Sequence, residues 1–372
     1  MKFSQPLHGL RGVASLMVLI GHVTFGFSDH LYHDDATLAM LARYVANFGT
    51  YGVELFFVIS GYVITASCLK YSPGEFAGRR FWRLYPVFAL FTVLYFVLNH
   101  VTHYEPSKLG LDGLLFNLTF LNIFSGTQAL SPNAWSITFE VWYYISTYGL
   151  LWFLLRSESR WRVIGAMLFF TLAGFMLTAY DITIYFAGGA VLYFIHQRLR
   201  PTIAPGPATA IAAAAFAVIA VIATTMDFPI TTYLEVPGQM LPAVALVAAT
   251  LIFVQAVLFG EGIVSRVLCS APVRFVGTIS YTLYLAHPYV YIVMRELMRR
   301  LYRMNGGPLP WQTMILPWLA LNIVAALAVS WIIHKLIEVG PYQLIYHSRI
   351  YRDPKPADAT ETVETASVRP AA

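Results

Sequence analysis

The sequence predicts an all-α protein, a polytopic bundle of transmembrane helices with about ten spans. Of its 372 residues, 58% are hydrophobic and only 12% are charged, against roughly 25% charged residues in soluble domains. Several apolar runs approach the roughly 20 residues that a helix needs to cross a bilayer. Trp, Tyr and Arg stand at the ends of these runs, as residues at a membrane interface do.

The predicted spans follow the apolar runs in chain order. They cover residues 10–29, 50–69, 84–102, 134–155, 161–179, 182–197, 209–226, 239–259, 275–298 and 313–337. The run at 111–124 is shorter and predicts a re-entrant or interfacial helix. Residues 1–345 form the predicted membrane domain. The polar segment 346–372 contains Pro and lacks apolar periodicity, which predicts a disordered cytoplasmic tail.

The basic residues predict the orientation of the bundle. Most of the 24 Lys and Arg residues fall in segments that are cytoplasmic if the N-terminus is inside, so both termini are predicted to be cytoplasmic. The cluster "MRELMRRLYR" at 294–303 is the exception. This bias and lipid headgroups explain the net charge of +5, and no nucleic acid partner is expected.

The first span contains a titratable base within its apolar segment, where an ionisable side chain costs free energy. His22 lies inside the apolar run, eleven residues after Arg11. Eleven residues are about three helical turns and roughly 16 Å, so the two side chains share one helix face. A buried ionisable group in a membrane helix usually marks a functional site. The alternative is a structural His bonded across a helix interface, which leaves Arg11 unexplained.

The first cytoplasmic loop carries a group of arginines. In "EFAGRRFWRLYP", Arg80 and Arg83 stand on adjacent turns of a helix start, close to Trp82 and Tyr85. The positive-inside rule alone would accept Lys equally well. Arg at every position favours phosphate binding, because a guanidinium bonds two phosphate oxygens and stacks on flat rings. A phosphorylated ligand at the inner face is therefore expected.

Two acidic residues lie in predicted spans, each about one to two turns from the outer end of its helix. Glu54 is in "GTYGVELFFVISGYVI" and Glu140 is in "NAWSITFEVWYY". Glu140 is a candidate catalytic residue and Glu54 a candidate for substrate contact, with a hydrogen-bonded carboxyl that closes the bundle as the alternative for each. Trp135 and Tyr143 supply flat amphipathic rings beside Glu140. Such rings suit either sugar faces or an interface belt.

His287 precedes a proline in the middle of the ninth span, in "SYTLYLAHPYV". Proline frees a backbone carbonyl and bends a membrane helix, so a polar cavity nearby is expected. His287 could contact substrate or only satisfy the broken turn.

These motifs together resemble the acyltransferase 3 family of integral membrane O-acyltransferases, from about residue 5 to 345. The matching pieces, in order, are "LHGLRGVASLMVLIGH", "YGVELFFVISGYVI", "RRFWRLYP", "WSITFEVWYYI" and "ISYTLYLAHP". The sequence departs from the family at three positions. His8 replaces a frequent Asp, Phe139 replaces the first of a frequent pair of Glu, and Val339 replaces a frequent Arg.

The resemblance implies transfer of an acyl group, commonly acetyl, from cytoplasmic acyl-CoA to a hydroxyl of a surface or exported glycan or glycolipid. It maps the catalytic His to His22, its basic partner to Arg11, and the Arg-x-x-Arg motif to Arg80 and Arg83. The acidic positions map to Glu54 and Glu140. The expected location is the bacterial inner membrane. No metal and no tightly bound cofactor are expected, because acyl-CoA is a substrate, and a homodimer is left open.

These residues predict a mechanism in which arginines hold the CoA phosphates and the thioester reaches His22. A neutral His, with an ordinary pKa near 6.5, accepts a hydroxyl proton well at neutral pH. Direct attack by the acceptor is favoured, an acyl-histidine intermediate being the alternative. Glu140 would orient the acceptor or balance charge on His22. A glycan or lipid transporter that uses the buried charges as a proton relay, and a non-catalytic export scaffold, are the other classes considered.

Overall fold

The computed structural model describes residues 4–103, 105–199, 202–226 and 238–346. Across these ranges the chain is helical apart from its connections, and its one strand-like contact is an isolated parallel bridge between Ile203 and Gly260. The predicted all-α class is therefore confirmed. The predicted disordered tail lies outside the described residues from position 347 onward.

The helical elements occupy most of each described range. In chain order they are α1 (Gln5–Leu31), α2 (Ala36–Thr50), α3 (Gly52–Lys70), α4 (Pro73–Thr102), η1 (Pro106–Lys108), α5 (Leu111–Leu118), α6 (Asn122–Ser125), α7 (Ala134–Leu155), α8 (Arg162–Ala179), η2 (Asp181–Thr183), α9 (Ile184–Leu199), α10 (Pro205–Thr225), α11 (Met240–Phe259), α12 (Ile263–Leu268), α13 (Ala271–Met304), α14 (Trp311–Ile333), the π-helical η3 (His334–Val339) and α15 (Gly340–Tyr346).

Seven helical stretches in the described part of the chain are long and apolar enough to cross a membrane. They are Gln5–Leu31, Ala36–Lys70, Pro73–Thr102, Arg162–Ala179, Pro205–Thr225, Met240–Phe259 and Trp311–Ile345. The prediction of ten spans is not confirmed, because the segments predicted at 134–155, 182–197 and 275–298 are helices outside this set. Helix α9 has only 16 residues, and the last turns of α13 carry the charged cluster at 294–303.

Helix α2 was not predicted from the sequence. Asp35 caps it by accepting a 2.8 Å hydrogen bond from the backbone N of Leu38, and Tyr51 alone separates it from α3. Polar residues such as Arg43 and Asn47 interrupt the apolar run there without interrupting the helix. Glu54 lies in the first turn of α3, near a helix end as the sequence predicts, and α2 extends the apolar stretch back to Ala36.

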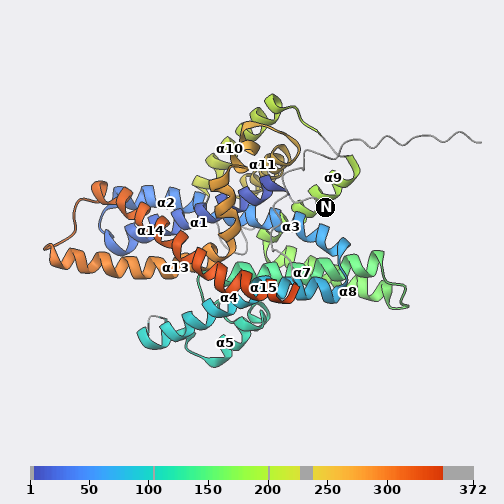
Figure 1. The fold of residues 1–372 in the computed structure, drawn as a ribbon, viewed down its shortest axis with the longest axis horizontal. Coiled ribbons are helices and arrows are strands. Elements are labelled where there is room, and N and C mark those ends of the chain that lie inside the picture. Colours follow the sequence, from blue (N-terminus) through green and yellow to red (C-terminus); the bar gives the residue numbers. More distant parts are fainter. Residues whose placement is uncertain (1–3, 104, 200–201, 227–237, 347–372) are drawn as a thin grey trace, which may run out of the picture.

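Helix α1, which carries Arg11 and His22, packs against several other helices. It packs against α13, α2, α3 and α14; α1, α2, α13 and α14 share one side of the molecule in Figure 1, and α3, α7, α8 and α9 gather on the other. The backbones of α1 and α13 meet at glycines. A Cβ built on Gly12 would lie 2.6 Å from the backbone N of Gly277, so only glycine permits this approach.

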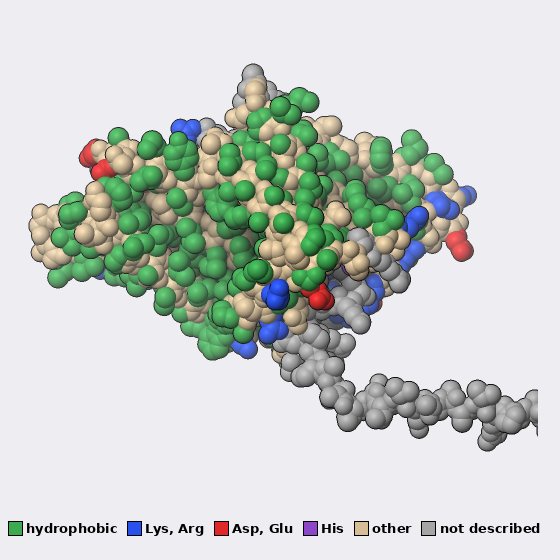
Figure 2. Space-filling view, turned by 90° about the horizontal axis from the view of Figure 1, so that it is seen from above, with side chains coloured by type: hydrophobic (Ala, Val, Ile, Leu, Met, Phe, Trp, Pro, Cys, Tyr) green, Lys and Arg blue, Asp and Glu red, His purple; other side chains and the backbone are tan. Residues whose placement is uncertain are grey.

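The surface matches that of a protein surrounded by lipid. Figure 2 shows a face covered mostly by hydrophobic side chains, with Lys and Arg gathered toward the edges of the view. On α8, for example, Leu168 and Phe170 are 64% and 69% exposed. An apolar surface this extensive would aggregate in water and is stable only in contact with hydrocarbon.

Candidate active site

Two histidines from distant parts of the chain form a direct pair at the α1–α13 interface. The Nδ1 atom of His22 lies 2.8 Å from the Nε2 atom of His287. The ring centroids are 5.1 Å apart and the ring planes differ by 18°. His287 is buried, with 1% of its surface exposed, whereas His22 is exposed. The structure thus brings together two residues that the sequence placed 265 positions apart.

The proline after His287 leaves a backbone carbonyl of α13 free to bond the start of α7, next to this pair. Pro288 has no backbone N–H, so the carbonyl of Tyr284 loses its helical donor. The side-chain amide of Asn133, just before α7, donates to this carbonyl instead. The hydroxyls of Ser136 and Tyr284 are a further hydrogen-bonded pair, 2.7 Å apart. The Tyr284 ring, whose centroid is 6.3 Å from that of His287, is held beside the histidines.

A small polar cavity lies on the other side of Tyr284. Its volume is about 30 Å³, and its lining residues are Arg11, Val53, Phe56, Phe57, Ser60, Ser136, Ile137, Glu140, Tyr281 and Tyr284. Glu140 accepts a 2.7 Å hydrogen bond from the Ser60 hydroxyl and a second hydrogen bond from Tyr144. The volume suffices for about two water molecules. Arg11 and Glu140, which the sequence assigned to different roles, therefore share one cavity.

The arginines of α4 extend this polar region. Arg80 donates a 2.8 Å hydrogen bond to the Ser67 hydroxyl, and its guanidinium lies 5.7 Å from the centroid of the Tyr144 ring. Arg83 is close enough to Arg80 for electrostatic interaction. Arg11, Arg83 and Arg274 likewise interact with His8, which is bonded to Thr278 at 3.1 Å. Four arginines from α1, α4 and α13 therefore form one cationic region.

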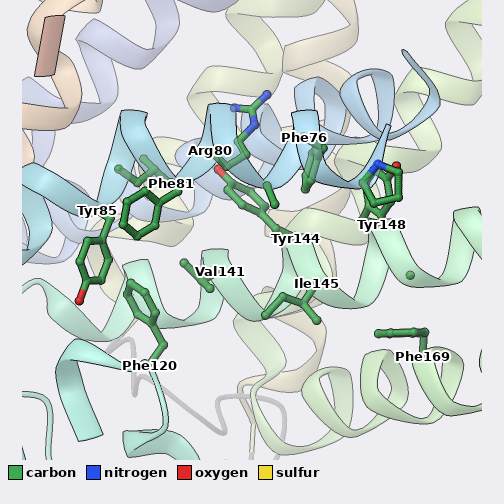
Figure 3. Close-up of a pocket in the computed structure, with 14 residues that line it drawn as sticks. Phe76, Arg80, Phe81, Tyr85, Phe120, Val141, Tyr144, Ile145, Tyr148 and Phe169 are labelled. Atoms are coloured by element: carbon green, nitrogen blue, oxygen red, sulfur yellow. The ribbon is translucent and has the colours of Figure 1, made fainter. Parts of the chain in front are cut away.

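An apolar pocket of about 400 Å³ lies between α4, α7 and α8 (Figure 3). Its lining residues are Pro73, Phe76, Ala77, Arg80, Phe81, Leu84, Tyr85, Phe120, Val141, Tyr144, Ile145, Tyr148, Gly149 and Phe169. In Figure 3 the guanidinium of Arg80 points away from the pocket, so the stem of this side chain contributes to the wall. Tyr144, which lines this pocket, donates its hydroxyl hydrogen bond to Glu140 at the small cavity.

Comparison with known protein families identifies the family of this chain. The family model of the acyltransferase domain that defines the acyltransferase 3 family matches residues 6–335. The chain belongs to the acyltransferase 3 family. Its apolar helices and this membership make it a multi-pass membrane protein. No curated protein and no solved structure matches the chain.

Three of the positions that the acyltransferase 3 resemblance maps, His22, Arg11 and Glu140, lie at the histidine pair or at the small cavity. Arg11 lies at the small cavity, and Tyr284 connects that cavity to His287 and His22. Within the described residues, no hydrogen bond or ion pair joins Glu140 to His22; Ser60 and Tyr144 are the hydrogen-bond partners of Glu140. The acyltransferase 3 motifs therefore lie at two neighbouring places, the histidine pair and the cavity lined by Arg11 and Glu140, with Tyr284 next to both.

Three of the residues predicted to contact substrate lie elsewhere. Glu54 is fully buried, and neither of its carboxyl oxygens has a hydrogen-bond partner among the described residues. The ring of Tyr143 stacks on Phe186 with centroids 4.3 Å apart, and the ring of Trp135 packs against Phe57 and Phe139. None of the three lines either cavity described above.

Asn133 and Arg274 belong to the site but were not predicted from the sequence. The signal for Asn133 is Pro288, which implies a freed carbonyl without showing which donor satisfies it. Arg274 stands in the first turn of α13, where the positive-inside rule already accounts for an arginine. No group of three or more metal-ligating side chains gathers within the ranges that the structure describes.

Proposed function

We propose that this protein is an O-acetyltransferase of the bacterial inner membrane. It moves an acetyl group from cytoplasmic acetyl-CoA to a hydroxyl of a surface or exported glycan, free or lipid-linked. The observation that carries this proposal is the His22–His287 pair, whose His22 lies on the same helix as Arg11. An imidazole on the same helix face as a cationic phosphate-binding group is suited to acyl transfer from a phosphorylated carrier.

His22 acts as the general base for direct attack. Its Nε2 atom takes the proton of the acceptor hydroxyl while the oxygen attacks the thioester carbonyl carbon. The tetrahedral intermediate then collapses, the C–S bond breaks, and the CoA sulfur leaves with the proton that His22 held. The products are the acetyl ester and CoA, and His22 returns to its neutral form.

The two substrates reach His22 from opposite ends of α1. Arg11, Arg80, Arg83 and Arg274 hold the CoA phosphates toward the N-terminal end. Because the cavity at Arg11 takes only about two water molecules, the pantetheine chain must displace side chains there as it enters. Beyond His22, Phe25 and Asp29 are also exposed on the same face, and this face provides the acceptor with access from the C-terminal end.

Transfer of radiolabelled acetyl groups tests this function. Membranes that contain the protein are incubated with labelled acetyl-CoA, and the glycan and glycolipid fractions are counted against membranes without it. Label should appear in one of these fractions only when the protein is present. Labelled CoA should not exchange into acetyl-CoA without an acceptor, since direct transfer forms no acyl-histidine. A protein that inserts into the membrane but transfers no label would contradict the proposal.

Glu140→Gln should lower the acetyl transfer rate about tenfold. The substitution weakens the charge-assisted hydrogen bonds from Ser60 and Tyr144, and one such bond contributes about 1.5 kcal/mol or more. A loss of about 1.4 kcal/mol corresponds to a factor of ten. The measurement is the initial rate of label transfer at fixed acetyl-CoA, normalised to protein in the membrane.

Glu54→Gln is the matched control for this prediction. Glu54 is also a glutamate on an apolar helix, but neither of its oxygens accepts a hydrogen bond among the described residues. Its neutral isostere should retain activity within about twofold. Equal losses in both variants would show that Glu140 has no special role at the Arg11 cavity.

A further inference from the structure

The hydrogen bonds of the histidine pair determine which nitrogen of His287 carries a proton. The Nδ1 atom of His287 lies 3.1 Å from the carbonyl oxygen of Leu283. A carbonyl oxygen can only accept, so this nitrogen must be the donor. In a neutral imidazole the other ring nitrogen is then an acceptor. The Nε2 atom of His287 therefore offers a lone pair to His22.

The geometry of the two rings then sets the tautomer of His22. A separation of 2.8 Å between Nδ1 of His22 and Nε2 of His287, with ring planes 18° apart, places the rings edge to edge. The N–H of one ring consequently points at the lone pair of the other. Since Nε2 of His287 accepts, Nδ1 of His22 donates. Neither ring has a carboxylate within hydrogen-bond reach in the described part of the chain, so no anion there favours a charged ring and both rings are neutral.

We propose that His287 is a positioning residue that holds His22 as its Nδ1–H tautomer and so keeps the lone pair on Nε2. This inference rests on the proposed function, in which Nε2 of His22 is the base. The opposite tautomer would set two lone pairs against each other across the pair and place a proton on Nε2. Such an imidazole cannot accept the acceptor's proton.

The same contact assists during the reaction. When Nε2 of His22 takes the hydroxyl proton, the ring becomes cationic and its Nδ1–H bond to His287 strengthens. The carbonyl oxygen of Leu283 ends this chain of hydrogen bonds, since it accepts from Nδ1 of His287. His287 thus performs, as a neutral ring, the orienting task that a carboxylate performs in serine hydrolases. Its burial prevents water from replacing it.

The tautomer can be read directly from ¹⁵N spectra of the full-length protein labelled at histidine and reconstituted in lipid. The His22 signals are identified by their loss in His22→Ala. The expected wild-type spectrum shows a protonated Nδ1 and an unprotonated Nε2 on His22. A wild-type spectrum with a protonated Nε2 would overturn the proposal without any activity measurement.

Variants at position 287 connect the tautomer to turnover. His287→Leu removes the acceptor, so the Nδ1–H signal of His22 should be lost or mixed and kcat for acetyl transfer should fall about a hundredfold. The KM for acetyl-CoA should remain within about twofold. His287→Gln supplies an amide oxygen as acceptor and should recover most of both readouts. If His287→Leu leaves tautomer and kcat unchanged, or if Gln fails to rescue either, His287 does not position His22.

His30 provides the control for a merely structural role. Its Nδ1 atom lies 2.8 Å from the hydroxyl of Tyr291, so it also connects α1 to α13 by one side-chain hydrogen bond. His30→Leu should leave the His22 tautomer and kcat unchanged; an equal loss would mean that helix attachment explains both. An Nδ1–H tautomer in a protein that transfers no acetyl group would contradict the proposed function while leaving the pairing of the rings intact.

Discussion

His22→Ala is expected to lower the rate of acetyl transfer by about 10²- to 10⁴-fold, the usual contribution of a general base. The substitution removes the only group in the proposed mechanism that accepts the hydroxyl proton. It should not affect insertion, because His22 is exposed and, among the residues that the structure describes, its side chain bonds only His287. The measurement is label transferred per unit of protein, with a thermal unfolding curve in detergent recorded for each variant.

His33→Ala is the matched control for this substitution. His33 lies in the connection after α1, on the surface, and its ring is 3.2 Å from the carboxylate of Asp34. Activity should therefore be unchanged. If His22→Ala retained more than about a tenth of wild-type activity with an unaltered unfolding curve, general-base catalysis by His22 would be excluded.

Replacing both Arg80 and Arg83 by Ala is expected to raise the KM for acetyl-CoA about a hundredfold. Each guanidinium–phosphate hydrogen bond contributes about 1.5 to 3 kcal/mol, and about 2.8 kcal/mol corresponds to a factor of one hundred. Because the phosphates take no part in the bond changes, kcat at saturating donor should change less than KM. Initial rates over a range of acetyl-CoA concentrations separate the two parameters.

Arg79 supplies the comparison within the same helix turn. It is bonded to Glu75 at 2.9 Å and to the Tyr342 hydroxyl at 3.1 Å, so its donors serve the packing of α4 against α15. Arg79→Ala should leave the KM for acetyl-CoA within about threefold. If the double variant at 80 and 83 lowered kcat but left KM unchanged, the phosphate-binding site would not be on α4.

The fold could be predicted from the sequence where a long apolar run forms the helix. It could not be predicted where a capping residue starts a helix or where a helix continues through a charged segment. The helices at 10–29 and 84–102 follow from long, predominantly apolar runs. Helix α2 does not, because its polar residues interrupt the apolar run, although Asp35 caps a helix there. Similarly, α13 extends through the charged cluster at 294–303, where a rule based on hydropathy ends the span.

The candidate site divides along the same line. His22 and Arg11 were predicted because an ionisable side chain inside an apolar helix is costly and therefore noticeable. Their partners depend on contacts between helices, which a single sequence does not encode locally. In the sequence Asn133 is only a polar residue of a loop, and its hydrogen bond to the freed carbonyl of Tyr284 is visible only in the structure. The stacking of Tyr143 on Phe186 likewise removes a ring that the sequence offered for sugar contact.

The pairing of His22 with His287 also affects how the protein is made. The two residues are separated by 265 positions, and chains are synthesised at about 5 to 20 residues per second. The first helix therefore waits between about 13 s and about 50 s in the membrane before its partner emerges from the ribosome. During that interval the nascent chain has a histidine without an orienting neighbour. Catalytic competence thus appears only when nearly the whole bundle has been inserted, so truncated chains should be inactive toward acetyl-CoA.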